Sequence, residues 1–227
     1  MVQQQKTSMK VCTDACILGS YAAKLAKNLQ ISSCLDIGTG TGLLSLMLAQ
    51  DSAIKIDAID IDKNAVSQAG ENFEGSPWSN RLRAIFGDIN VYTSPVKYDL
   101  IISNPPFYED DLLSPHTSKN IAKHHGALRL QQLIDAIDLN LSPSGYFFVL
   151  LPFKRVTEFE EMSRQKNFFL HRKLLIRNSP LHPWYRAILF FARLEDKLMV
   201  EELVIRDKGN NYSDDFISLL KNYYLHL

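Results

Sequence analysis

A chain of 227 residues with 46% hydrophobic and 22% charged residues has the length and composition of one medium-sized globular domain. Its formal net charge of zero gives no overall indication of a polyanionic partner. The longest apolar run is far too short to span a membrane, the first residues lack a signal-peptide core, and the three cysteines lack zinc-ligand spacing. We therefore expect a cytoplasmic protein with no membrane segment and no metal centre.

Strand-like and helix-like segments alternate along the first two thirds of the chain. Amphipathic periodicity predicts a helix over residues 13–28. The predicted strands that follow are 34–37, 54–59, 82–86, 99–103 and 146–151, and helices are predicted from Leu43, after Asp62 and over 128–141. Residues 142–145, rich in serine, proline and glycine, are predicted to form a turn. Such alternation indicates a parallel sheet with helices on both faces.

The last third of the chain breaks this alternation. A helix is predicted over 154–165, followed by strands at 169–177 and 186–194 with no helix between them, which indicates an antiparallel hairpin. Residues 200–205 are typical of a short edge strand, and Ser213 can begin a last helix. The whole predicts a Rossmann-like α/β fold with a mostly parallel seven-stranded sheet. We expect one domain over 1–227: an N-terminal lid and helix (1–30), a core (31–151) and a C-terminal hairpin and helix (152–227).

The tetrapeptide Asn104-Pro105-Pro106-Phe107 directly follows the fourth predicted strand. It resembles the catalytic motif of methyltransferases that modify a planar amino group. The lone pair of such a nitrogen is delocalised, so catalysis needs hydrogen-bond acceptors and a positioning wall rather than a strong base. The Asn104 side-chain oxygen and a proline backbone carbonyl can supply the acceptors, and Phe107 can supply a stacking face. A rigid turn at the end of a buried strand is the alternative.

Glycines at 38, 40 and 42 lie between the first predicted strand and the helix after it. Their spacing differs from the dinucleotide fingerprint, and Asp36 precedes them. A carboxylate there is a poor neighbour for a pyrophosphate but suits a cationic ligand. S-adenosylmethionine carries a sulfonium and an ammonium group and no phosphate, so the pattern favours this cofactor.

Two further aspartates follow the next two predicted strands. Asp60 can accept hydrogen bonds from a ribose diol, and Asp88, with the Ile89 backbone beside it, suits an adenine amino group. Each could instead be a helix cap or a turn residue. Because ligands of open α/β sheets bind at the carboxyl ends of the strands, the ordered series predicts S-adenosylmethionine binding.

Nearly the whole chain is similar to the bacterial family that methylates N6 of adenosine-37 in valine tRNA, a family with the class I methyltransferase fold. The similar segments are 9–19, 35–48, 76–78, 99–107, 203–206 and 211–213. The family usually has tyrosine where this chain has Phe107. The resemblance implies methyl transfer from S-adenosylmethionine to that adenine nitrogen, with S-adenosylhomocysteine as product and the anticodon arm of valine tRNA as partner. A monomer is expected.

The resemblance also implies the role of individual residues. Asn104, Pro105, Pro106 and Phe107 would hold the target adenine, which is flipped out of its stack. The expected cofactor-binding residues are Lys10, Thr13, Asp36, Gly38, Gly40, Gly42, Asp60, Ile61, Asp88 and Ile89. Asp99 is expected to be structural rather than a base.

Two segments are candidates for RNA contact. Nine basic and only three acidic residues lie between Lys154 and Arg193, as in a phosphate-binding flank, although solvated faces of a helix and two strands would look the same. The predicted loop 108–127 contains His116, His124 and His125, which are irregularly spaced for a metal site.

Three other functions share parts of this pattern. A protein methyltransferase of glutamine amides normally has a separate N-terminal helical domain, whereas the predicted cofactor strand here begins at residue 34. A guanine-N2 methyltransferase of ribosomal RNA tends to be longer, with a duplicated domain. A non-catalytic RNA-binding module would be expected to have lost Asn104 or the glycines, and both are present.

Overall fold

The computed structural model describes residues 2–7, 11–105 and 130–224. Six residues that the sequence singles out lie outside the described ranges: Lys10, Pro106, Phe107, His116, His124 and His125. In the described part of the chain no helix is long and apolar enough to cross a membrane.

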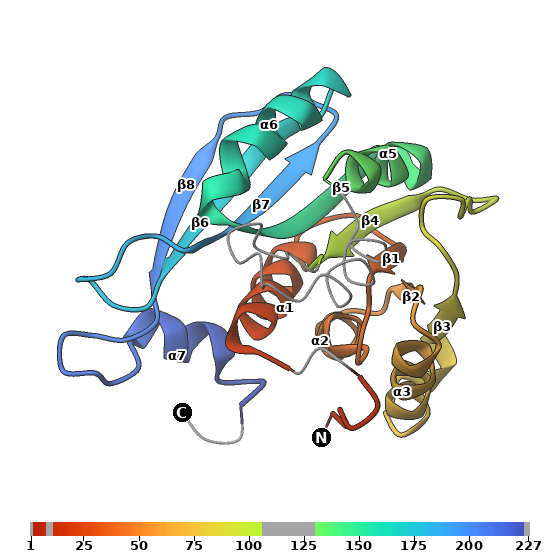
Figure 1. Ribbon diagram of the computed structural model, residues 1–227, viewed down its shortest axis with the longest axis horizontal. Helices are drawn as coiled ribbons and strands as arrows, with labels where there is room; N and C mark the ends of the chain where they lie inside the picture. Colours follow the sequence, from red (N-terminus) through yellow and green to blue (C-terminus); the bar gives the residue numbers. More distant parts are fainter. Residues whose placement is uncertain (1, 8–10, 106–129, 225–227) are drawn as a thin grey trace, which may run out of the picture.

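A single eight-stranded sheet forms the centre of the molecule, in the order β3-β2-β1-β4-β5-β7-β6-β8 (Figure 1). The strands are β1 (Ser33–Ile37), β2 (Lys55–Asp60), β3 (Leu82–Phe86), β4 (Tyr98–Ser103), β5 (Leu141–Pro152), β6 (Phe169–Arg177), β7 (Arg186–Ala192) and β8 (Met199–Val204). The expected mostly parallel sheet and its β6–β7 antiparallel hairpin are confirmed. The predicted edge strand is present as an eighth strand, β8, which pairs with β6 in parallel.

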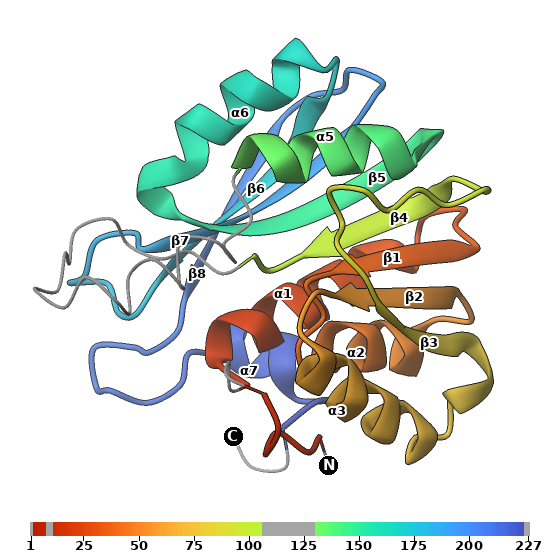
Figure 2. The ribbon, with the colours of Figure 1, turned by 45° about the vertical axis from the view of Figure 1, so that its right-hand side comes forward.

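Helices cover both faces of the sheet, as predicted (Figures 1 and 2). One face carries α1 (Thr13–Ala26), α2 (Leu43–Asp51), α3 (Lys63–Glu74) and α7 (Asp214–Leu220), and the other carries α5 (Leu130–Asn140) and α6 (Val156–Gln165). Short 3-10 turns, η1 (Ser79–Arg81) and η2 (Phe153–Arg155), precede β3 and α6. The sheet therefore has two cores, one with Ile17, Leu48 and Phe216 and the other with Leu133 and Phe159.

Two helices begin at the capping residues that the sequence predicts. Asp62 caps α3 by accepting a hydrogen bond from the Asn64 amide at 2.9 Å, and Ser213 caps α7 by accepting one from the Phe216 amide at 3.1 Å. Both caps satisfy backbone donors that have no partner inside the helix.

The turn predicted at 142–145 lies instead within the long strand β5. Leu141 pairs with Tyr98, and Tyr146 pairs with Leu100, so several residues of β5 bulge out opposite one residue of β4. The buried Asn140 fixes the start of this bulge, because its side-chain amide donates to the Tyr92 carbonyl at 3.2 Å and to a carbonyl within α5.

One edge of the sheet collects the carboxyl ends of seven strands. Strands β1 to β5 run in one direction, β7 runs against β5 and β6, and β6 and β8 therefore run with the first five. We call this side, where β1 to β6 and β8 end, the carboxyl edge. Ligands of open α/β sheets bind on this side.

Candidate active site

The glycine loop after β1 presents an open backbone surface. Gly38 and Gly40 have φ values of 72° and 56°, which favour glycine, and an added Cβ atom would meet no atom within 4 Å at either position. Gly42 differs, because a Cβ atom there would lie 2.5 Å from the Phe73 ring. The first two glycines therefore leave room for a ligand, whereas Gly42 allows α2 to pack closely against α3.

Asp36 lies fully buried beneath this loop. Its Oδ2 atom accepts hydrogen bonds from the hydroxyl groups of Thr39 and Ser45, both at 2.7 Å. Its Oδ1 atom has no hydrogen-bond partner among the described residues. Burial raises the pKa of Asp36 to about 6, although the two hydroxyl groups act in the opposite direction. A buried carboxylate with one unpartnered oxygen is suited to a cationic ligand.

Asp60, the last residue of β2, joins that strand to the glycine loop. Its Oδ2 atom accepts from the Gly40 amide and its Oδ1 atom from the Asp62 amide, both at 2.9 Å. Burial raises the pKa of Asp60. Each carboxylate oxygen can accept a further hydrogen bond, so the side chain is held in place and can still bind the hydroxyl groups of a ribose.

The ends of β2 and β3 present apolar surface beside Asp60. Ile61 is 54% exposed, and Phe86, at the end of β3, is 53% exposed. Sequence reasoning missed Phe86, although an aromatic residue at the carboxyl end of a strand could have indicated it. Asp88 accepts from the Asn90 amide and side chain at 2.9 and 2.7 Å, which makes a tight turn, and Ile89 is buried.

Asn104 is placed beside the glycine loop by the pairing of β4 with β1. Ser103 lies opposite Ile37, and its hydroxyl donates to the Ile37 carbonyl at 2.9 Å. Because Gly38 and Asn104 directly follow these paired residues, they emerge side by side at the carboxyl edge. Asn104 is half-buried and Pro105 is buried.

Of the two expected lid residues, only Thr13 is described. It begins α1 and lies close to Tyr224 near the C-terminus, whose pKa is raised to about 12 mainly by burial. The structure therefore connects Thr13 to the C-terminal segment; nothing in the described contacts brings it to Asp36 or Gly38.

A second contact with the glycine loop comes from α3. Asn72 is buried, and its side-chain amide donates to the Thr41 carbonyl at 2.8 Å. The same side chain donates to the Gln3 carbonyl and accepts from the Gln3 amide, both at 2.8 Å. Sequence reasoning missed Asn72 because no local pattern distinguishes it from other polar residues of an amphipathic helix.

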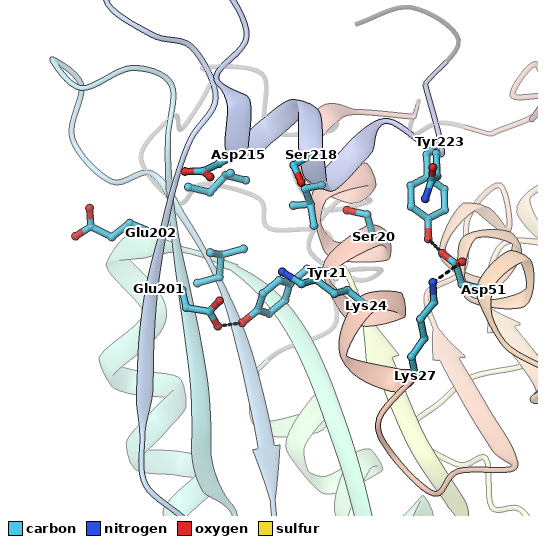
Figure 3. A pocket seen from close by; sticks show the side chains of 14 residues that line it. Ser20, Tyr21, Lys24, Lys27, Asp51, Glu201, Glu202, Asp215, Ser218 and Tyr223 are labelled. Carbon is cyan, nitrogen blue, oxygen red and sulfur yellow. Dashed lines mark hydrogen bonds and ion pairs between the residues drawn. The ribbon is translucent and has the colours of Figure 1, made fainter.

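A cavity of about 500 Å³ lies away from these residues, between α1, β8 and α7 (Figure 3). Tyr21 hydrogen-bonds Glu201 across it, and Lys27 pairs with Asp51 at 2.8 Å. None of the predicted site residues lines it. Among the described residues, no group of three or more His, Cys, Asp or Glu side chains is arranged to hold a metal ion.

The basic segment between Lys154 and Arg193 is largely neutralised. Seven of its nine basic residues pair with carboxylates: Arg155–Glu158, Lys166–Asp135, Arg172–Glu201, Lys173–Glu160, Arg177–Glu202, Arg186–Asp14 and Arg193–Asp138. Several of these acids lie far away in the sequence. The pairings favour ordinary solvated faces over a continuous phosphate-binding flank.

Comparison with known proteins gives relatives over the whole chain. The methyltransferase small domain family matches residues 20–132. The tRNA1(Val) (adenine(37)-N6)-methyltransferase of Dyadobacter fermentans is 41% identical over 99% of this chain and 94% of that protein. The protein of the same name in Flavobacterium johnsoniae is 36% identical over 100% of this chain and 97% of its own length.

A solved structure shares the fold. A predicted O-methyltransferase from Agrobacterium tumefaciens has a TM-score of 0.72 and 16% identity, covering 92% of this chain and 96% of its own. The chain thus has a methyltransferase fold that carries the glycine loop, the strand-end aspartates and the Asn104 motif. The two relatives compared above match it over nearly their whole length and have the same name. The chain belongs to the tRNA1(Val) (adenine(37)-N6)-methyltransferase family.

Proposed function

We propose that this protein transfers the methyl group of S-adenosylmethionine to N6 of adenosine-37 in valine tRNA and releases S-adenosylhomocysteine. The observation that carries the proposal is the junction of β1 and β4. Asn104 and Gly38 directly follow the paired residues Ser103 and Ile37, so in this proposal a planar amino group held by Asn104 would meet a ligand held by the glycine loop. The names of the full-length relatives support the choice of substrate.

The residues of the glycine loop fit the proposed cofactor. In this proposal Asp36 and the backbone of Gly38 and Gly40 hold the methionine end, since Asp36 is buried with an unpartnered oxygen and both glycines face open space. Asp60 holds the ribose. When bound, S-adenosylmethionine supplies an electrophilic methyl group on a positively charged sulfur.

The adenine end of the cofactor would lie further along the carboxyl edge. Ile61 offers exposed apolar surface there, and Asp88 and Ile89 follow β3, which is the neighbour of β2. Asp88 would accept from the adenine amino group. Lys10 belongs to the same proposal as a lid residue, on the resemblance alone.

Asn104 and Pro105 are proposed to orient the target nitrogen. The Asn104 side-chain oxygen and the Pro105 carbonyl accept hydrogen bonds from the adenine amino group, which aligns the nitrogen for in-line attack. The carbon–nitrogen bond forms as the carbon–sulfur bond breaks, and the surplus amino proton passes to water. Pro106 stiffens the loop, and Phe107 stacks on the flipped base.

Asp99 does not serve as the base in this scheme. It lies near the start of β4, whereas Asn104 follows its end, and it accepts hydrogen bonds from Ser32 and Ser33 at 2.7 to 3.2 Å. Burial alone would raise the pKa of Asp99, but these hydrogen bonds lower it. Its role is to hold the start of β1 against β4.

The partner is proposed to be the anticodon arm of valine tRNA, bound by a monomeric, cytoplasmic enzyme. Guanine N2 and a glutamine amide would fit the same acceptors, so the test must compare substrates. We expect label from tritiated S-adenosylmethionine to enter unmodified valine tRNA and not a transcript with guanosine at position 37. If valine tRNA stays unlabelled while ribosomal RNA or a release-factor peptide is labelled, the substrate assignment is wrong.

A further inference from the structure

Two loops beyond the cofactor residues also lie at the carboxyl edge. Residues 178–185 connect β6 to β7, and residues 205–213 connect β8 to α7. Figure 2 shows both loops projecting on the side where β4 ends. The strand order separates β6 from β4 by β5 and β7, so at about 4.8 Å per strand β6 lies about 14 Å across the sheet from β4. The register places Ser103 level with Lys173, so β6 continues to Arg177, about 13 Å further along the strand, before the first loop begins.

The two loops are joined, and an arginine stacks on an aromatic ring in each: Arg177, which ends β6, in the first and Arg206 in the second. The Arg206 amide donates to the Asn178 carbonyl at 2.8 Å. The Arg177 guanidinium lies 4.3 Å from the centre of the Trp184 ring, and that of Arg206 lies 4.5 Å from the centre of the Tyr212 ring. We call these four side chains and the two loops the stacking surface.

The stack at Arg206 extends to a second aromatic ring. Tyr212 stacks in turn on the buried Phe216, at 4.7 Å and an interplanar angle of 20°. The ring of Tyr212 is therefore covered on both sides, and the guanidinium is the outermost layer. Arg206 donates to the Asn210 carbonyl and forms no ion pair within the described residues, unlike the neutralised arginines between 154 and 193.

The other loop is exposed around its aromatic residue. Leu181 is 86% exposed, His182 and Pro183 are exposed, and Trp184 is half-buried. The Nε atom of Arg177 is buried without a hydrogen-bond partner in the described chain, and its nearest carboxylate partner, Glu202, is 3.8 Å away.

The base of this loop is fixed relative to the cofactor residues. Tyr185 donates to Asp14 at 2.8 Å, and Arg186 donates to the other oxygen of Asp14 at 3.1 Å. Asp14 lies in the first turn of α1, which packs on α2, the helix that follows the glycine loop. The stacking surface thus has a set position along the same edge as Asn104.

We propose that the stacking surface binds single-stranded nucleotides of the RNA next to the target base. Bases unstacked from a loop are commonly held on aromatic faces and on guanidinium planes, and arginines also bind phosphates. Trp184 supplies the aromatic face, and Arg206 supplies a guanidinium that forms no ion pair with the carboxylates of the described residues. This inference rests on the proposed function, because the target base must lie at Asn104 for these nucleotides to reach the loops.

The test is RNA binding by four variants, each with one charge or one ring changed; the fourth, Trp184→Phe, keeps an aromatic ring. Trp184→Ala removes the aromatic face, and Arg206→Gln removes the charge. Arg193→Gln is the matched control, because Arg193 also stacks on a ring, that of Phe168 at 4.5 Å, but follows β7 at the opposite edge. Fluorescence anisotropy with a labelled valine anticodon stem-loop gives the dissociation constant over a series of salt concentrations. Calorimetry with S-adenosylhomocysteine shows whether each variant is folded and keeps its cofactor site.

We expect Trp184→Ala to weaken RNA binding about fivefold or more with an unchanged salt dependence. Arg206→Gln should weaken RNA binding and should reduce the slope of log affinity against log salt concentration by about one. Trp184→Phe should restore most of the affinity, and Arg193→Gln should behave as wild type. All should bind S-adenosylhomocysteine normally.

If Arg206→Gln and Trp184→Ala both bind the stem-loop as tightly as Arg193→Gln does, the inference is overturned. Should Trp184→Ala fail to fold, Arg206→Gln decides alone, because its side chain is at the surface of the stack. Failure of the proposed function has a different signature, namely wild-type protein that does not methylate adenosine-37 of the full-length tRNA.

Discussion

The side-chain amide of Asn72 donates a 2.8 Å hydrogen bond to the backbone carbonyl of Thr41, and α3 thereby holds the glycine loop in place. The same side chain makes two hydrogen bonds with the backbone of Gln3. One buried amide therefore connects the N-terminal segment, residues 2–7, to the loop that carries Gly40.

Asn72→Ala should weaken both folding and cofactor binding. It removes three hydrogen bonds and leaves the Thr41 carbonyl without this donor, which we expect to reduce the free energy of unfolding by about 1–3 kcal/mol. Urea unfolding and calorimetry with S-adenosylhomocysteine measure the two effects. Gln68→Ala is the matched control, because Gln68 accepts from the Lys6 amide at 3.1 Å but does not bond Thr41. Equal loss of cofactor affinity in both variants would show that the N-terminal segment matters and the loop contact does not.

Asn104→Ala should slow methyl transfer by about 10²-fold or more, because it removes an acceptor that acts on the nitrogen in the transition state. Binding of S-adenosylhomocysteine should stay near the wild-type value. Single-turnover rates with saturating RNA measure the first effect and calorimetry the second. Asp99→Asn, near the other end of β4, serves as control and should keep most of the rate. An undiminished rate in Asn104→Ala would remove this residue from the mechanism.

Asp60→Ala should weaken binding of the cofactor by about 1–3 kcal/mol, because a half-buried acceptor for the ribose is lost together with its bond to the Gly40 amide. Titration calorimetry with S-adenosylhomocysteine gives the difference. Asp57→Asn in the same strand is the control, since Asp57 pairs with Arg83 and Tyr98 and not with the glycine loop. A wild-type dissociation constant in Asp60→Ala would contradict the ribose assignment.

Asp36 should make the stability of the cofactor-free protein depend on pH. Burial raises the pKa of Asp36 from 3.8 to about 6, so between these values the folded protein binds more protons than the unfolded chain. The contribution of this group to stability is therefore largest at low pH and decreases as the pH rises through that window. Chemical unfolding of wild type and Asp36→Asn should show this component in the wild type alone.

Cofactor affinity should have the opposite pH dependence. A cationic ligand favours ionised Asp36, so the affinity for S-adenosylmethionine should fall as the pH drops below about 6, approaching tenfold per pH unit. Calorimetry across this range measures it. Asp36→Asn should bind more weakly with a flat profile. A wild-type profile that is equally flat would mean that Asp36 does not face the cationic groups.

The sequence predicts the fold well where signals are local. The bounds of β3 and β6 agree with the predicted ranges 82–86 and 169–177, because apolar strand residues there are bounded by turn residues. The bulge in β5 could not be predicted, because Pro143 and Gly145 are residue types that are equally typical of a turn. The ion pairs of the basic segment were also beyond reach, since Arg186 and Asp14 lie 172 positions apart.

The candidate site likewise has residues that the sequence predicts and residues that it does not. Asp36, Gly38, Gly40 and Asp60 lie at or just after the ends of predicted strands in a recognisable order, and they lie at the carboxyl edge of the sheet. Asn72 carries no local signal, because its importance comes from contacts with Thr41 and Gln3 that only the folded chain creates.

The most direct test is nucleoside mass spectrometry of valine tRNA after incubation with the protein and S-adenosylmethionine. A transcript made without modifications should gain N6-methyladenosine, located at position 37 by digestion with a sequence-specific ribonuclease. The Asn104→Ala protein should leave it almost unmodified under the same conditions. Methylation at another position or another atom, or none with a protein that binds the cofactor, would contradict the account.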